Sequence, residues 1–491
     1  MHNKLPKALG ERLRSAPPAA GLPSPRAAGS THVLYVLRTC CRSEGNYSLE
    51  VALRIAAMLD LPLVCLAVVE DSFPPTMCGG LARPRAPTVR AATFQLEGLQ
   101  QLQPAFVNRG TQLLVHVERD GCRAAVAMSL ASRAALVVTD EHYGVEPHAA
   151  ATARLARTGA PLWLCDCHCT VPSILLPAAA LAGGNAGFLR ATQEARAERL
   201  MDTWFPPSAP PPPRQPPVAP AWSIDLSVDG AIESVLALPS RRDASVAPVR
   251  HTRGGQKAAL ARWRGYVSGR GLQGYAQHRN NPLSAEGRGA SRMSAYVNAG
   301  MIDPHLMARE ALAARADKFM SEFVGFREAP YLWCLRHPGG YSDASVAVPV
   351  WARGQLRTAE GLGRPGVGPP LNDLERGHSG DALWDDCQRC LMLSGEMHNN
   401  VRMAWGKAIP AWHAAVLPVV VSGAGAPSAA QRLQAALELL IYLNDKFALD
   451  GGAPPSYGGL LWVSRLARSP WRRWPPHTTP HQRPQPPHQR R

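Results

Sequence analysis

The sequence predicts an α/β domain with a doubly wound parallel sheet, followed by an all-α domain. Three observations lead to this prediction. Apolar runs alternate with helical patterns in the first third of the chain, a proline-rich stretch interrupts it at residues 205–222, and helical patterns dominate afterwards. With 491 residues, of which 46% are hydrophobic, the chain can fill more than one core.

Five short apolar runs in the first part of the chain are predicted to be strands. The runs are 32–38, 61–69, 111–118, 135–141 and 161–167. Their continuous apolar character is typical of strands that are buried on both faces. The intervening segments, for example 47–59 and 89–107, have apolar residues at i, i+3 and i+4 spacing, as helices do. We therefore predict that residues 32–175 form a doubly wound α/β domain.

Segments rich in proline mark the predicted domain boundaries. Residues 1–31 contain many Ala, Pro and Arg and a single acidic residue, so we expect a flexible leader that resembles a transit peptide. Residues 176–222 are predicted to be a linker, which ends in the polyproline stretch FPPSAPPPPRQPPVAPAW. The basic, proline-rich residues 469–491 are predicted to form a disordered tail.

From about residue 223 onward, helical patterns replace strand patterns. The predicted helices are 255–267, 291–297, 304–326, 382–393, 397–408 and 429–449. We therefore predict that residues 223–468 form a helical domain with long loops.

The chain is strongly basic. Its formal net charge is +16, and the segment from Arg465 to the end contains seven Arg and no acidic residue. Such a charge favours a polyanionic partner, of which nucleic acid is the obvious example. No apolar run reaches the roughly 20 residues of a membrane-spanning helix, so we expect a soluble intracellular protein. The leader suits a chloroplast and the basic tail a nucleus, which leaves the compartment open.

Eleven cysteines, an odd number without regular spacing, indicate reduced thiols. The tightest cluster is CDCHC, in which Cys165, Cys167 and Cys169 lie beside His168. Alternate cysteines on one face of a strand can bind a metal, and a strand end that is merely rich in Cys is the other interpretation. We favour the second, because no further ligand pair follows at the spacing of a zinc site, and we predict no metal.

Two stretches near the C-terminus carry a family resemblance. LWDDCQRCLMLSGEMHNNVRMAWGKAIPAWH, at 383–413, and YLNDKFALDGGAPPSYGGLLW, at 442–462, resemble the photolyase and cryptochrome flavoproteins, in particular the class II DNA photolyases and their bacterial relatives. The similarity runs from about residue 32 to about residue 470. It includes HVLYVLRTCCRSEGNYSLEVALRIAAMLDLPLV, which is similar to the opening strand and helix of the family.

The resemblance implies a photolyase-type α/β domain, a helical FAD-binding domain, and light-driven DNA repair. In that reaction, reduced FAD donates an electron to a flipped cyclobutane pyrimidine dimer, so the implied partner is DNA that contains such dimers. Many members also carry an antenna chromophore, a deazaflavin or a folate, and the sequence leaves its presence and identity open.

A cryptochrome-type blue-light photoreceptor without repair activity, which would act through protein partners, is the alternative function. The chain after Ser469 lacks the family's DNA-gripping final segment, and this departure favours the alternative. A flavin-free interaction module is a third interpretation.

The resemblance assigns eight residues to FAD binding. They are Tyr275, Ser291, Arg292, Met293, Ser294, Arg402, Asn444 and Asp450. Arg402 and Asp450 match an ion pair that is buried beside the isoalloxazine ring. Asn444 matches the amide that faces flavin N5, with a solvent-exposed helix Asn as the alternative. Ser291 and Ser294 match hydroxyls at a helix start that bind the phosphates, with an ordinary N-cap as the alternative.

Three tryptophans match the family's electron relay between the surface and the flavin. They are Trp384, Trp405 and Trp412, at the spacing of the family. Pro410 is a departure, because it replaces a helix former and removes a helix hydrogen bond between the last two tryptophans. The last step of the relay is therefore less well supported by the sequence than the first.

Four residues match the pocket of the flipped lesion. Glu322, in SEFVGFRE, matches the carboxyl that hydrogen-bonds the dimer, and a Glu on a solvated helix face is the alternative interpretation. Asn399, Met403 and Trp462 would line the same pocket. Flipping is required because a lesion inside the duplex cannot approach the flavin closely.

Overall fold

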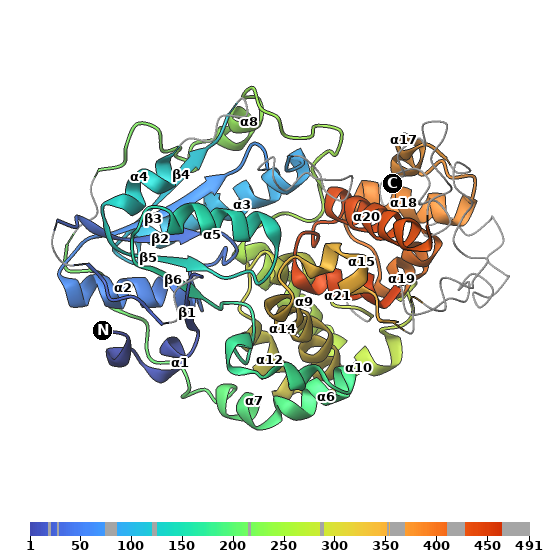
Figure 1. The fold of residues 1–491 in the computed structure, drawn as a ribbon, viewed down its shortest axis with the longest axis horizontal. Coiled ribbons are helices and arrows are strands. Elements are labelled where there is room, and N and C mark those ends of the chain that lie inside the picture. The colour runs from blue at the N-terminus through green and yellow to red at the C-terminus, as the bar shows by residue number, and fades with distance from the viewer. Residues whose placement is uncertain are drawn as a thin grey trace.

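The computed structural model describes most of the chain. It covers residues 1–17, 21–26, 29–73, 86–119, 125–214, 218–284, 289–350, 353, 369–409 and 428–463, with the backbone alone at 459–463. An α/β part lies on one side of the molecule and a helical part on the other (Figure 1). No helix in the described ranges is both long and apolar enough to cross a membrane.

A six-stranded sheet organises the α/β part. The strands are β1 (Leu13–Ser15), β2 (His32–Leu37), β3 (Leu63–Val69), β4 (Gln112–Val117), β5 (Ala134–Asp140) and β6 (Leu162–Cys165). Their order is β1-β6-β5-β2-β3-β4, in which β2 to β6 are parallel and β1 is antiparallel to β6. The five predicted strands and the doubly wound parallel sheet are thereby confirmed.

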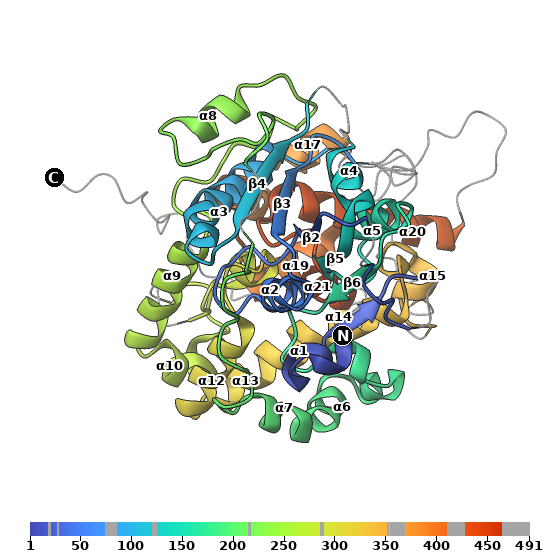
Figure 2. The ribbon, with the colours of Figure 1, turned by 90° about the vertical axis from the view of Figure 1, so that its left-hand side faces the viewer.

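Helices cover both faces of the sheet (Figure 2). Val33, Tyr35 and Leu37 of β2 share a core with α2 (Tyr47–Leu59) and α3 (Val89–Val107). The alternate β2 residues pack in a second core with α4 (Val126–Ser132) and α5 (Glu146–Ala156). Because successive strand residues point to opposite faces, an entirely apolar strand needs a layer on each side.

The N-terminal residues differ from the prediction of a flexible leader. Residues 1–17 form η1 (His2–Lys4), α1 (Lys7–Gly10) and β1, and β1 pairs with β6. Leu5, Leu9 and Leu13, which are spaced four residues apart, are buried in the main core. Burial of this apolar stripe offsets the entropy of ordering the segment, so the flexible-leader prediction is wrong for these residues.

The segment predicted as a linker contains short helices. They are η4 (Ala178–Leu181), α6 (Gly184–Ala191) and α7 (Gln193–Arg199), which follow η3 (Ser173–Leu175). The proline-rich stretch then runs along α2, where the Glu50 carboxylate accepts a hydrogen bond from the Ala209 amide at 2.7 Å.

The helical part confirms the predicted class. Its elements are α8 (Ala231–Leu236), α9 (Gln256–Ser268), α10 (Gly271–His278), α11 (Ser294–Asn298), α12 (Pro304–Ala313), α13 (Asp317–Met320), η5 (Ser321–Phe326), α14 (Arg327–Arg336), η6 (Gly340–Ser342), α15 (Ala344–Ala347), α17 (Leu371–Arg376), α18 (Ala382–Ser394), α19 (Asn399–Ala408), α20 (Ala429–Phe447) and α21 (Pro454–Val463). The helix predicted at 304–326 is interrupted between α12 and α13, where Arg315 adopts a left-handed φ of 52°. The π-helix η5 then follows α13 directly.

A buried arginine links the two parts. Arg90, on α3, donates hydrogen bonds to the carbonyl oxygens of Leu391 at 3.2 Å and Phe447 at 2.6 Å. These carbonyls belong to the last turns of α18 and α20, and the Leu391 carbonyl also accepts a hydrogen bond from the Gly395 amide that caps α18. One side chain of the α/β part thereby holds the ends of two helices of the helical part.

Candidate functional site

The C-terminal end of α10 meets η5 and α19, the elements that carry Glu322, Asn399, Arg402 and Met403 of the predicted site. His398, just before α19, hydrogen-bonds the carbonyl oxygen of Arg279 at 2.9 Å, and Asn400 donates to the carbonyl oxygen of Asn280 at 3.0 Å. The Arg279 side chain in turn pairs with Glu322 of η5 at 3.2 Å. Segments that are more than a hundred residues apart in the sequence therefore meet at one place.

Arg402 and Asp450 form the predicted ion pair. The guanidinium contacts both carboxylate oxygens, at 2.8 and 3.1 Å, and both side chains are largely buried. Asn298, at the end of α11, donates to the backbone carbonyl of Asp450 at 2.9 Å. This bond ties the ion pair to the segment that carries Ser291 and Ser294. A bidentate pair of this kind holds both side chains in one geometry.

Asn444 lies in the last turn of α20 and is buried. Its amide donates to Asp445 Oδ1 at 2.9 Å, and Asp445 also accepts bonds from the Gly452 amide and from the Tyr457 hydroxyl. The alternative of a solvent-exposed helix Asn is therefore wrong. Burial in a hydrogen-bonded network fixes the direction of the amide.

Trp384 and Trp405 are brought together as a stacked pair. Their ring centroids are 6.1 Å apart at an interplanar angle of 9°, and neither side chain is exposed. The Trp384 indole donates to the Trp405 carbonyl at 3.1 Å, and the Trp405 indole donates to Gln388 at 3.2 Å. Trp412 and Pro410 lie outside the described residues.

The remaining predicted FAD residues surround the start of α11. Ser291 is half-buried and Ser294 exposed, and neither hydroxyl has a hydrogen-bond partner among the described residues. No side chain caps α11, so the N-cap alternative does not account for these serines. Arg292 pairs with Glu396 at 2.9 Å, and Met293 is buried.

Tyr275 lies close to η5. Its ring packs edge-on against Phe319 with a centroid distance of 5.1 Å. Burial, together with the nearby charge of Glu322, raises the pKa of the Tyr275 phenol to about 12. The hydroxyl therefore stays protonated and able to donate a hydrogen bond over the whole physiological range.

Glu322 is held by two cations on an unusual helix. It forms ion pairs with Arg279 at 3.2 Å and with Lys318 at 2.7 Å, and its side chain is only 17% exposed. The alternative of a solvated helix face is therefore wrong. The six residues of η5 form a π-helix, a geometry that is frequent at functional sites. A Cβ at Gly325 would lie 1.5 Å from Asn185 Oδ1, so a larger residue there would have to displace the Asn185 side chain of α6.

The other predicted lesion residues are placed in part. Asn399 is exposed at the first position of α19, and its amide approaches the Met403 sulfur at 3.8 Å. Trp462 belongs to α21, where only the backbone is described. Arg279 and Lys318, the two partners of Glu322, were missed by the sequence analysis. Lys318 carries a usable signal, because Lys and Glu four residues apart lie on one helix face.

Comparison with known proteins finds photo-lyases that are similar to this chain in sequence. No family model matches the chain. A deoxyribodipyrimidine photo-lyase of Methanothermobacter thermautotrophicus is 26% identical over 436 residues, which is 88% of this chain and 86% of that protein. Photo-lyases of Arabidopsis thaliana (29% over 197 residues) and Potorous tridactylus (28% over 226 residues) match over 39% and 45% of this chain, and over only 35% and 38% of their own lengths.

Solved structures share the fold. A bacterial class III photolyase from Agrobacterium tumefaciens superposes with a TM-score of 0.58 at 18% identity, covering 89% of this chain and 80% of that chain. A cryptochrome from Synechocystis superposes with a TM-score of 0.59 at 15% identity, covering 89% and 82%. On the strength of these relatives, the fold and the matched motifs, this chain belongs to the photolyase/cryptochrome family.

Proposed function

We propose that the protein is a light-driven DNA repair flavoprotein of the deoxyribodipyrimidine photo-lyase type. The observation that carries the proposal is the grouping of the Arg402–Asp450 pair, the buried Asn444 amide and the stacked Trp384–Trp405 pair within α18 to α20 and the loop that follows. Bound FAD would supply the light-driven electron that splits a cyclobutane pyrimidine dimer.

The donor set of the site fits FAD. Arg402 would present its guanidinium, with the charge already balanced by Asp450, to the polar edge of the ring system. The hydroxyls of Ser291 and Ser294, which have no other described partner, are suited to phosphate oxygens. Asn444, whose Nδ2 is held by Asp445, would present a neutral amide to the ring.

The two stacked indoles would carry electrons inward through the core. A stacked pair with centroids at 6.1 Å brings two oxidisable rings close together in surroundings that exclude water. Both indole N–H groups are hydrogen-bonded, which fixes the orientation of the rings.

On the substrate side, Glu322 would hydrogen-bond the flipped pyrimidines. Arg279 and Lys318 beside it would attract the phosphates of the damaged strand, and the net charge of +16 supports DNA binding in general. Asn399 and Met403 would form the rim of the pocket.

The proposal can be tested on the full-length protein. We expect that the protein, after reconstitution with FAD in dim light, shows a flavin absorption band. Once its flavin is reduced and the sample is illuminated, the protein should restore thymines in single-stranded DNA that contains cyclobutane dimers. Failure to bind FAD would contradict both this function and the alternative below.

A cryptochrome-type photoreceptor is the second candidate. The ion pairs of Glu322 favour it, because a lesion would have to compete with Arg279 and Lys318 for the carboxylate. Clean photoreduction of the bound flavin without repair of dimers would select this function. Repair in light, and not in darkness, would select the first.

A further inference from the structure

Three cysteines and an aspartate meet at the carboxyl ends of adjacent strands. Cys40 follows β2, Asp140 ends β5, Cys165 ends β6, and Cys167 follows two residues later. We call these four residues the strand-end cluster. The chain continues from β2 to β3 and β4 on one side, whereas β5 and β6 lie on the other. The cluster therefore lies at the topological switch point, where doubly wound sheets leave a crevice.

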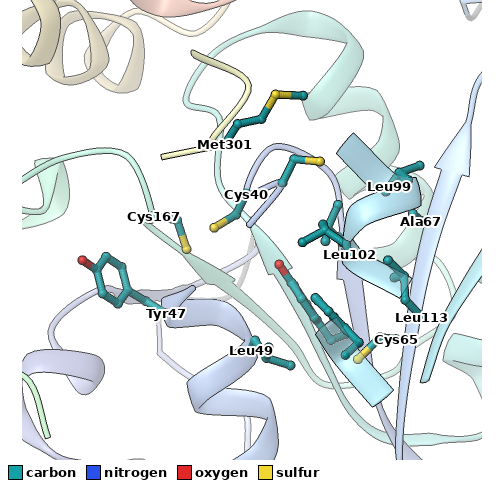
Figure 3. Packing of buried hydrophobic residues seen from close by; sticks show 14 of the residues in the cluster. Cys40, Tyr47, Leu49, Cys65, Ala67, Leu99, Leu102, Leu113, Cys167 and Met301 are labelled. Carbon is teal, nitrogen blue, oxygen red and sulfur yellow. The ribbon is translucent and has the colours of Figure 1, made fainter. Parts of the chain in front are cut away.

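The donor atoms of the cluster lie close together. One ligand atom from each of Cys40, Asp140 and Cys167 lies within 4.8 Å of the other two. The Cys165 sulfur is not part of this group of three and approaches it through Cys167, whose sulfur is 4.0 Å away. All four residues are buried. Figure 3 shows the sulfurs of Cys40 and Cys167 pointing toward one another from two different loops.

We propose that the strand-end cluster is a structural zinc site with three thiolate ligands and one carboxylate ligand. Zinc is four-coordinate and tetrahedral in structural sites, and Zn–S bonds of about 2.3 Å place neighbouring sulfurs about 3.8 Å apart. The Cys165–Cys167 separation is close to that value. Three soft thiolates with one oxygen select zinc over magnesium or calcium, which prefer oxygen ligands alone.

The surroundings of the cluster hold its ligands in place. Asp140 Oδ2 accepts hydrogen bonds from the backbone amides of residues 38 to 40, and Oδ1 accepts one from the Tyr35 hydroxyl at 2.9 Å. Ser48 Oγ lies 3.2 Å from the Cys167 sulfur. Hydrogen bonds of this kind orient the ligands of metal sites and are as much a part of the site as the ligands themselves.

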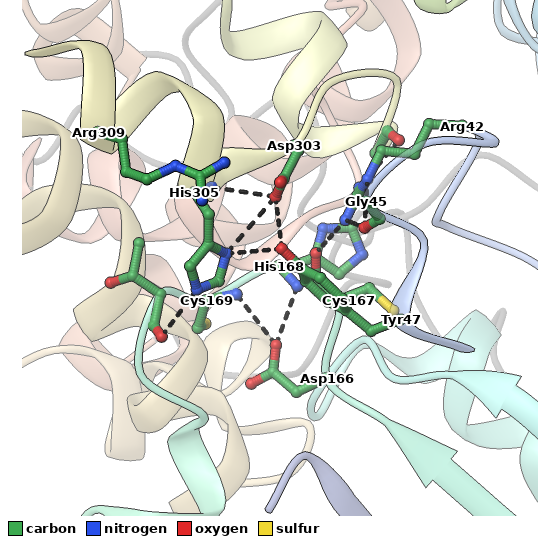
Figure 4. A network of polar contacts seen from close by, with 12 residues as sticks. Arg42, Gly45, Tyr47, Asp166, Cys167, His168, Cys169, Asp303, His305 and Arg309 are labelled. Carbon is green, nitrogen blue, oxygen red and sulfur yellow. Dashed lines mark hydrogen bonds and ion pairs between the residues drawn. The ribbon is translucent and has the colours of Figure 1, made fainter. Parts of the chain in front are cut away.

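Two buried arginines favour negative charge at the cluster. Arg42 donates to the carbonyls of Gly45 and Cys167, which Figure 4 labels, and to the carbonyl of Gly300. Arg12 donates to three carbonyls of the loop that carries Cys167. Within the described ranges, neither guanidinium forms an ion pair with a carboxylate. Because four anionic ligands outweigh one divalent cation, a loaded site would carry negative charge beside these two cations.

The closed environment indicates a structural role. With Cys165 as the fourth ligand, four protein ligands would complete the tetrahedron, so no position would be open for a substrate. The ion would join the ends of β2, β5 and β6. It would also fix the loops that contact the helical part, since Arg42 also bonds Gly300 of that part at 3.0 Å.

The first experiment measures metal on the wild-type full-length protein. We expect about one zinc per chain by mass spectrometry of the metal content. X-ray absorption should give three sulfur neighbours at about 2.3 Å and one oxygen at about 2.0–2.2 Å. A protein that stays metal-free after incubation with Zn²⁺ or Co²⁺, or a Cys40–Cys167 disulfide in the purified chain, would overturn the proposal.

The second experiment uses neighbouring cysteines as a matched pair. Cys40→Ala removes a proposed ligand, whereas Cys41→Ala removes a buried thiol whose sulfur packs against Gly98. We expect Cys40→Ala to lose the thiolate-to-cobalt absorption of the Co²⁺-loaded protein and at least about tenfold in zinc affinity, and Cys41→Ala to keep both. Equal metal binding by the two variants would contradict the site. Should Cys40→Ala not fold, the coordination measured on the wild type decides.

Discussion

The strand-end cluster and the start of α11, in the proposed flavin region, differ in whether their polar side chains have hydrogen-bond partners. At the cluster, Cys40, Asp140 and Cys167 are sealed from solvent and held by neighbouring loops. In the flavin region, the hydroxyls of Ser291 and Ser294 have no described partner. Buried polar groups that satisfy one another stabilise a fold, whereas polar groups left without partners are available to a ligand. The difference suggests that the α/β part supplies rigidity and the helical part supplies binding.

The largest expected change in stability is a loss at acidic pH that arises in the α/β part. Burial, reinforced by the charge of Arg38, lowers the pKa of His142 to about 3. Because this folded-state pKa is below that of the unfolded chain, the unfolded state takes up a proton first as the pH falls. Stability should therefore be lost between about pH 6.5 and about pH 3, with His142 contributing about 3 kcal/mol between pH 7 and pH 4.

Chemical denaturation at several pH values checks this expectation. His142→Gln should flatten the acid side of the stability profile, whereas the same change at the exposed His251 should leave the profile as in the wild type. An unchanged profile in His142→Gln would assign the acid sensitivity to other groups.

The next effect concerns the ion pair of the flavin region. Asp450→Ala leaves Arg402 largely buried without its partner, so we expect a loss of about 2–3 kcal/mol in the free energy of unfolding and weaker FAD binding. Asp386→Ala breaks the exposed pair with Arg389 and should change stability by less than about 1 kcal/mol. Urea denaturation measures both, and equal losses would mean that burial does not distinguish the two pairs.

A smaller change in stability is expected for the indole pair. Trp405→Phe keeps an aromatic ring beside Trp384 and should lower stability by about 1–2 kcal/mol, while light-driven reduction of bound flavin becomes much slower. Trp333→Phe, which alters a ring stacked on His337, is the control and should reduce flavin at the wild-type rate. A wild-type photoreduction rate in Trp405→Phe would exclude this residue from the relay.

The smallest effect on stability should accompany a clear effect on function. Glu322→Gln keeps the shape of the side chain and should change the free energy of unfolding by less than about 1 kcal/mol. If Glu322 hydrogen-bonds the lesion, repair of dimers should fall by about tenfold to a hundredfold with FAD binding retained. Repair assays with equal flavin occupancy test this, and undiminished repair would leave Glu322 with the structural role of pairing Arg279 and Lys318.

Local patterns predicted much of the fold. The bounds of α2 and α3 agree with the sequence because Asn46 and Thr88 cap them and their apolar spacing is regular. The helix α14 was not predicted, because Pro330 interrupts its pattern. For the proposed site, long sequence motifs identified Arg402, Asp450 and Asn444. Arg279 was identified only in the structure, by its ion pair with Glu322.

By itself, the sequence determined the five parallel strands, the longer helices such as α2 and α3, and the family resemblance, because hydrophobic periodicity and motifs are properties of neighbouring residues. Tertiary structure alone decided that residues 13–15 join the sheet, that Trp384 stacks on Trp405, and that Cys40, Asp140 and Cys167 meet. The physical reason is that a parallel sheet brings together the ends of strands that lie about a hundred residues apart in the sequence. No local pattern encodes which of these strand ends become neighbours.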